Sequence, residues 1–365
     1  MAPTSTEVLD ALRPIVDPDF QKSIVELGFI KDLRIEGESV SFAIELTTPA
    51  CPVKAEFERS AVERVSALPG VSDVAVTMTS NTRKSAVGNS TEDILPGVKN
   101  TIAVASGKGG VGKSTASLNI ALALSQSGAK VGILDADVYG PSLPLLTGTS
   151  GRPHSENKLI HPLEKFGIKL MSMGFFLNES SPVIWRGPMV HGLIKQFLTD
   201  VKWGELDYLI IDLPPGTGDA ALTLTQQAPL SGAVIVTTAN DLSVIDAQKS
   251  LKMFNTVNVP VLGVIQNMSY FVPPDLPDRK YYIFGEGGGE RMARELGVDF
   301  LGEVPIDPRV VECGDKGDPI VRSAPDSPVA QAFIAMAGEL ARKLSMLAVS
   351  SQPIADGNIT WVTNP

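Results

Sequence analysis

The sequence predicts an α/β protein with a mostly parallel sheet that carries helices on both faces, preceded by a small α+β domain. Two observations support this prediction. From residue 100 to about residue 348, short apolar strands alternate with helical segments, whereas the first 80 residues follow a different pattern. The clearest strands of the long region are TIAVAS, VGILDAD, YLIIDLP, GAVIVTT and VPVLGVIQNM. Continuous apolar runs of this kind are typical of parallel strands that are buried on both faces.

The small domain is expected to span residues 1–80. Its pattern indicates a short helix over 6–16 that ends before Pro18, and then a hairpin of LGFIKDLRIEG and SVSFAIELTT. A second helix begins near Pro52 and ends at the Pro69-Gly70 pair, and VSDVAVTMT supplies a third strand.

The rest of the chain divides around one large domain. Residues 81–99 are polar, lack periodicity and contain two glycines and a proline, as a linker does. The large domain is then expected over 100–348, and 349–365 reads as a polar tail. Two folded units also agree with a length of 365 residues, which exceeds that of one ordinary domain.

Composition and charge exclude several classes of protein. No apolar stretch approaches the roughly 18 residues of a membrane span, so we expect no membrane partner. The formal charge of −10 opposes a nucleic-acid partner. Acidic residues near the N-terminus (Glu7, Asp10, Asp17) contradict a secretory or transit peptide, which predicts a cytoplasmic location. With only two cysteines, a disulfide framework is excluded.

The strongest motif is GKGGVGKST, which lies between the strand TIAVAS and a helical segment. Glycines let the backbone turn so that successive N–H groups face one anion beside a helix N-terminus. Lys113 adds a fixed positive charge, and the Ser114 hydroxyl suits the Mg²⁺ that accompanies a nucleotide. We therefore predict a P-loop that binds ATP. The predicted binding residues are Gly107, Lys108, Gly109, Gly110, Val111, Gly112, Lys113, Ser114 and Thr115.

Three aspartates are predicted to complete this site. Asp212 ends the strand YLIID, where a carboxylate at the carboxyl edge of a parallel sheet can hold Mg²⁺. The following PPGTGD is a turn suited to sensing the terminal phosphate. Asp135 and Asp137 end VGILDAD in the same way. Either of these two carboxylates could orient the water that attacks the phosphate.

Together, these motifs resemble the deviant-Walker P-loop ATPases of the MinD/ParA type. Within them, the sequence is most similar to the Mrp-type iron–sulfur cluster carriers. The resemblance rests on GKGGVGKST, LDADVYGPS, IIDLPPGTGD, NMSYF and WRGPM at 185–189, and it covers nearly the whole chain. The TTPACP segment around Cys51 resembles the PaaD-like domain that precedes the ATPase in bacterial members of that family.

The resemblance implies a function and a role for several residues. It implies an ATPase that carries a [4Fe–4S] cluster to apoprotein clients and acts as a homodimer. Lys108 would reach the nucleotide of the partner subunit, and Lys113 would hold the phosphates. Asp137 would position the attacking water, and Asn267 would recognise adenine. Ser114 and Asp212 would serve Mg²⁺.

One departure from the family pattern concerns the cluster. Members of the family usually carry a C-x-x-C pair after the NMS segment, but Pro273 and Leu276 stand at those positions here. Cys51 and Cys313 remain as candidate cluster ligands. Cys51 precedes a helix start, where the helix dipole would favour a thiolate, and a partly buried apolar role is the alternative. Cys313 reads more simply as a turn residue.

Two other functions stay open on the sequence alone. One is a positioning or partitioning ATPase of the same superfamily, and the other is a nucleotide-binding scaffold that has lost cluster binding. Membrane-bound positioning ATPases use a terminal basic amphipathic helix, whereas the last long helix here carries only two cations, Arg342 and Lys343. The histidines His154, His161 and His191 lack metal-ligand spacing.

Overall fold

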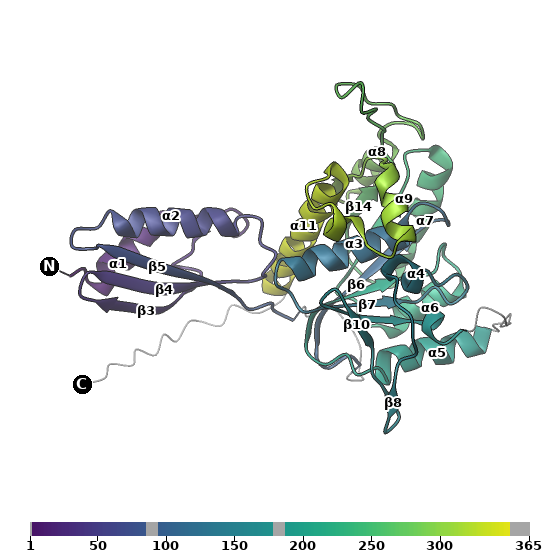
Figure 1. Ribbon diagram of the computed structural model, residues 1–365, viewed down its shortest axis with the longest axis horizontal. Coiled ribbons are helices and arrows are strands. Elements are labelled where there is room, and N and C mark those ends of the chain that lie inside the picture. The colour runs from purple at the N-terminus through teal and green to yellow at the C-terminus, as the bar shows by residue number, and fades with distance from the viewer. Residues whose placement is uncertain (1, 85–93, 178–186, 351–365) are drawn as a thin grey trace.

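The computed structural model describes residues 2–84, 94–177 and 187–350. A small N-terminal domain lies to the left in Figure 1 and a larger α/β domain lies to the right. Among the described residues, no helix combines the length and the hydropathy that a bilayer span requires.

The small domain consists of a three-stranded sheet with helices packed on it. Its elements are α1 Ser5–Leu12, β1 Val16–Asp17, β2 Lys22–Ser23, β3 Ile30–Glu36, β4 Ser39–Leu46, α2 Lys54–Ser66 and β5 Asp73–Ser80. β3 and β4 form the predicted antiparallel hairpin, and β5 pairs parallel to β4. Apolar side chains of α1, α2 and β4, among them Leu12, Phe57 and Ile44, form a core of their own.

The first helix is shorter than predicted. Thr4 caps α1 through a capping box with Glu7, but the helix ends at Leu12 rather than near residue 16. Pro14 explains the early end, because it lacks the N–H that would continue the helical hydrogen bonds after Arg13.

The large domain is built on an eight-stranded sheet in the order β10-β11-β7-β12-β6-β13-β14-β15. Its strands are β6 Val98–Ser106, β7 Val131–Asp135, β10 Leu163–Lys165, β11 Ile168–Ser172, β12 Leu206–Asp212, β13 Gly232–Thr237, β14 Val261–Gln266 and β15 Phe300–Glu303. Only the edge strand β10 pairs antiparallel within this sheet. A separate small hairpin consists of β8 Ser155–Glu156 and β9 Leu159–Ile160.

Helices cover both faces of this sheet (Figure 1). They are α3 Lys113–Gln126, α4 Leu143–Thr147, the short 3-10 helix η1 Met173–Phe175, α5 Gly187–Thr199, α6 Asp219–Gln227, α7 Asp241–Thr256, α8 Gly288–Leu296, α9 Pro308–Asp315, α10 Ile320–Ser323 and α11 Pro328–Ser350. Alternate residues of β6 enter two separate cores. Ile102 and Val104 pack with α3 and α11, whereas Ala103 and Ala105 pack with α5 and α7. The predicted fold class is therefore confirmed.

The order of the strands positions the site. β6 lies between β12 and β13, and the chain continues from β6 to β7 on one side and only later to β13 on the other. Ligands of open α/β sheets bind at the carboxyl ends of strands where the order reverses in this way. The loop that follows β6 is the Gly-rich segment.

The small domain packs at the amino ends of the strands of this sheet, opposite the Gly-rich loop. The Thr48 hydroxyl lies 2.9 Å from the Tyr208 hydroxyl near the start of β12, and both side chains are buried. Ala50 packs into the core of the large domain. The Arg342 guanidinium of α11 donates hydrogen bonds to Asp19 of the small domain and to Glu339 of its own helix.

The observed ends of the large domain differ slightly from those expected. β6 begins at Val98, inside the predicted linker, and α11 continues to Ser350, inside the predicted tail. The remaining tail residues, 351–365, lie outside the described residues, as do 85–93 of the linker and 178–186, which include the start of WRGPM.

Candidate functional site

The Gly-rich loop connects β6 to α3 in a conformation that requires glycine. Gly110 and Gly112 adopt left-handed backbone, with φ of 82° and 81°. Gly112 is the N-cap of α3, and a Cβ there would lie 2.1 Å from the Asn267 amide nitrogen. At Gly107 a Cβ would lie 2.2 Å from the backbone of Asp246 in α7. The loop therefore packs tightly against α7 and against the residue that follows β14. Its exposed residues, Gly109 and Gly110, lie shortly before the start of α3.

Lys113 and Asp212 meet at the base of this loop. The Lys113 Nζ lies 2.7 Å from Asp212 Oδ1, and the two side chains are 6% and 2% exposed. The Ser117 hydroxyl also donates to Asp212 Oδ1, at 2.7 Å, and Ser114 Oγ lies 3.5 Å from Nζ. The structure thus places Lys113, Ser114 and Asp212 together, and Ser117 is a further neighbour that the sequence reasoning did not assign.

Asp135 lies beside this pair with its carboxylate buried. Burial raises the pKa of Asp135 to about 7, and the nearby Asp212 carboxylate adds to this effect. Hydrogen bonds from the Leu143 N–H and the Ser172 hydroxyl act in the opposite direction. Asp135 is 1% exposed, so its carboxylate does not face solvent.

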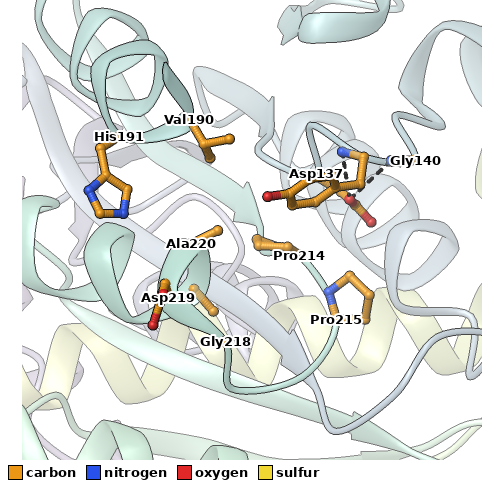
Figure 2. Close-up of a pocket in the computed structure, with 11 residues that line it drawn as sticks. Asp137, Gly140, Val190, His191, Pro214, Pro215, Gly218, Asp219 and Ala220 are labelled. Carbon is orange, nitrogen blue, oxygen red and sulfur yellow. Dashed lines mark hydrogen bonds between the residues drawn. The ribbon is translucent and has the colours of Figure 1, made fainter. Parts of the chain in front are cut away.

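Asp137, in contrast, faces a cavity of about 650 Å³ (Figure 2). Its Oδ1 accepts hydrogen bonds from the N–H groups of Tyr139 and Gly140, at 3.2 and 3.1 Å. The opposite walls come from the loop after β12 and from α5 and α6, through Pro214, Pro215, Gly218, Asp219, Val190 and His191. The predicted phosphate-sensing turn and one Asp of the DAD segment therefore border the same space.

His191 is a lining residue that reasoning from the sequence did not assign to the site. Its Nε2 lies 2.9 Å from the Thr223 hydroxyl of α6, which fixes the ring at the cavity wall. The residue belongs to α5 and follows the WRGPM stretch by two positions, but no spacing in the sequence connects that stretch with the P-loop.

Asn267 contacts the Gly-rich loop from the end of β14, and Lys108 is a residue of the loop itself. The Asn267 side chain, 7% exposed, donates to the Val111 carbonyl at 2.8 Å, so it holds the loop directly. Lys108 is half-buried, and within the described part of the chain its ammonium has no hydrogen-bond or ion-pair partner. Its backbone carbonyl accepts from the Ser106 hydroxyl.

The two cysteines are far from one another. Cys51 belongs to the small domain at the amino edge of the large sheet, next to Ala50. Cys313 lies on α9, and not in a turn as the sequence had indicated. α9 follows β15 and contacts α4 near the carboxyl ends of the strands, and the Cys313 Sγ lies 3.1 Å from the Ser323 hydroxyl. Within the described ranges, no group of three or more His, Cys, Asp or Glu side chains could hold a metal ion.

The expectation of a favoured thiolate at Cys51 was wrong. Burial raises the pKa of the Cys51 thiol, and the hydrogen bonds from backbone N–H groups at the start of α2 do not offset this. The thiol is half-buried in the small-domain core, which is the alternative that the sequence left open.

Both parts of the chain match known protein families. Residues 97–341 match the family model of NUBPL iron-transfer P-loop NTPases, and residues 5–78 match that of iron–sulfur cluster assembly proteins. The chain is 51% identical to the iron–sulfur cluster carrier protein of Synechocystis over 95% of its own length and 99% of that protein. It is 49% identical to the mouse iron–sulfur cluster transfer protein NUBPL over 68% and 79% of the two lengths.

A solved structure is similar to the large domain. It is a nucleotide-binding protein from Archaeoglobus fulgidus in complex with ADP, and it is 42% identical, with a TM-score of 0.55. The match covers 61% of this chain and 88% of that one.

Proposed function

Because this chain belongs to the family of NUBPL iron-transfer P-loop NTPases, we propose that it is an ATP-hydrolysing carrier that binds iron–sulfur clusters and transfers them to apoproteins. The observation that best supports the nucleotide site is the buried Lys113–Asp212 pair at 2.7 Å, at the start of the helix that follows the Gly-rich loop. We also propose a cytoplasmic location, where free thiols such as Cys51 and Cys313 stay reduced.

Each part of the site has a role in this proposal. The loop N–H groups and Lys113 hold the β and γ phosphates of ATP, and Asn267 recognises the base. The Ser114 hydroxyl and the Asp212 carboxylate are oxygen ligands of the kind that Mg²⁺ prefers, so these residues would hold it. Bound Mg²⁺ neutralises charge on the phosphate oxygens. Asp137 orients the attacking water in the cavity that it lines.

The cluster is cargo, and one chain does not offer a complete set of ligands for it. An iron–sulfur cluster needs about four soft ligands, whereas this chain has two thiols at opposite edges of one sheet. We therefore propose that ligands come from more than one chain. A homodimer with Lys108 at the partner's nucleotide supplies four thiols, and a client protein or a small thiol can complete a partial set.

Anaerobic reconstitution with ferrous iron and sulfide tests the carrier function. We expect the wild type to bind a cluster and to restore the activity of an apo-dehydratase that requires [4Fe–4S]. Cluster content should fall in Cys51→Ser, in Cys313→Ser or in both. Full iron and sulfide content in the double variant would exclude cysteine ligation, and no cluster in the wild type would favour the scaffold function. Phosphate release from ATP with Mg²⁺, compared with release in excess EDTA, tests hydrolysis separately.

A further inference from the structure

We propose that Asp135 and Ser172 are positioning residues that hold the loop carrying Asp137 in place for ATP hydrolysis. This inference rests on the proposed ATPase function. It also assigns separate roles to the two aspartates of the DAD segment, either of which could orient the attacking water on the sequence alone.

The Asp135 carboxylate joins both ends of the loop 136–143. Its Oδ1 accepts a hydrogen bond from the Asp137 N–H at 3.2 Å. Its Oδ2 accepts from the N–H groups of Ser142 and Leu143, at 3.0 and 3.1 Å, where α4 begins. A single side chain therefore fixes the start and the end of the loop, and the loop conformation places Asp137 at the cavity.

Ser172 attaches this arrangement to the neighbouring strand. It is the last residue of β11, it pairs in register with Asp135, and its side chain is fully buried. The Ser172 hydroxyl donates to Asp135 Oδ2 at 3.0 Å and accepts from the Gly174 N–H at 3.0 Å. At Gly174 a Cβ would lie 2.7 Å from the ring of Pro144, so η1 also packs closely on the end of the loop.

The two aspartates differ in what their oxygens can reach. Both oxygens of Asp135 accept hydrogen bonds from the protein, and the side chain is shielded from solvent. Asp137 accepts only through Oδ1, and in the described ranges its Oδ2 has no hydrogen-bond partner. Of these two aspartates, only Asp137 has a carboxylate oxygen available to a water molecule in the cavity. Asp135 and Ser172 therefore act through Asp137.

Ser172→Ala tests this assignment because it removes one hydroxyl that does not line the cavity. We expect kcat for ATP hydrolysis to fall about 10- to 100-fold, since a misplacement of about 1 Å has an effect of this size. KM for ATP and the affinity for ADP should change less than 3-fold or so. Ser172→Thr keeps the hydroxyl and should recover most of the lost rate.

Ser250→Ala is the matched control. The Ser250 side chain is equally buried, on α7, but its hydroxyl has no hydrogen-bond partner among the described residues. Its removal should leave kcat unchanged. In an Asp137→Asn background, Ser172→Ala should have no further effect on the residual rate, because the two residues act as one unit. A wild-type kcat in Ser172→Ala, or a full additional loss in the double variant, would overturn the proposal.

Amide hydrogen exchange gives a readout that does not depend on activity. Ser172→Ala should speed exchange at Asp137, Ser142 and Leu143, whereas Ser250→Ala should not. If the wild type hydrolyses no ATP, the proposed ATPase function fails, but exchange still tests whether Ser172 holds the loop. Unchanged exchange across residues 136–143 in Ser172→Ala would refute the positioning role.

Discussion

Lys113 and Asp212 neutralise each other when no phosphate is bound. Their 2.7 Å contact is almost fully buried, and a buried charge without a partner is strongly unfavourable. In the proposed function, a phosphate would offer the ammonium a new partner, and Asp212 would then be free to hold Mg²⁺. Each of the two buried charges therefore compensates the other in the absence of phosphate.

The contrast between Lys113→Ala and Asp137→Asn follows from these positions. Lys113→Ala removes a charged donor to phosphate, so ATP affinity should fall roughly 100-fold. Asp137→Asn keeps the buried pair, so ATP binding should survive within a few-fold, while hydrolysis falls by roughly 10² to 10⁴. Binding of a fluorescent ATP analogue and phosphate release measure the two effects. Equal loss of binding in both variants would contradict the role of Asp137.

Tyr208 makes the contact between domains sensitive to alkali. Burial raises the pKa of Tyr208 to about 12, and the hydrogen bond with Thr48 only partly offsets this. A raised folded-state pKa contributes stability that is complete below the unfolded value near 10 and is lost as the pH rises through about 12. By pH 11, the wild type should lose about 1 kcal/mol more than Tyr208→Phe. Urea unfolding from pH 8 to 11 measures this, and equal losses would contradict it.

Among the elements, the Gly-rich loop depends on its contact with α7. Gly107 allows the loop to lie directly against the backbone of Asp246, whereas Gly109 has open space around its Cα. A side chain at position 107 would therefore clash with α7, whereas a side chain at position 109 would not.

Gly107→Ala should lower the free energy of unfolding by about 1 to 3 kcal/mol, because its Cβ would force the loop away from α7. Gly109→Ala is the matched control, since nothing lies within 4 Å of its Cβ and it should leave stability unchanged without nucleotide. Thermal unfolding of the nucleotide-free protein measures both. A Gly107→Ala variant as stable as the control would show that the loop is not held against α7.

Elements with a strong local hydrophobic pattern were predicted from the sequence, and elements without one were not. The strands with long apolar runs, β6, β7, β12, β13 and β14, were found because such runs are typical of a central parallel sheet. β15 has only four residues, all half-buried, and it was missed. Ser172 and His191 were missed for another reason, since tertiary packing alone brings β11 and α5 to the aspartates.

At the scale of the whole molecule, the large sheet separates the P-loop from the small domain. The P-loop lies at the carboxyl ends of the strands, and Thr48 and Ala50 contact the large domain at the other edge. A second copy can therefore approach the P-loop face without displacing the small domain. Lys108 belongs to that face.

Lys108→Ala should weaken ATP-dependent dimerisation at least about 10-fold, because a lysine from a partner would neutralise phosphate charge at the interface. Nucleotide binding by the monomer should change less. Lys130→Ala is the control, since Lys130 is exposed just before β7, at the opposite edge. Light scattering with a non-hydrolysable ATP analogue measures the mass. An unchanged wild-type mass with nucleotide would contradict the homodimer.

The long helix α11 connects the carboxyl ends of the strands with the small domain. Its 23 residues correspond to about 35 Å. Pro328, at its start, borders a cavity of about 540 Å³ with Asp307 and Tyr270, beyond the ends of β15 and β14. Further along, Gly338 packs on Ala50 and Pro52, the residues on either side of Cys51. Between Pro328 and Gly338 the helix axis covers about 15 Å, so a tilt of roughly 5° moves one of these residues by about 1 Å relative to the other. A change in the tilt of α11 at its start would therefore be transmitted to the packing beside Cys51.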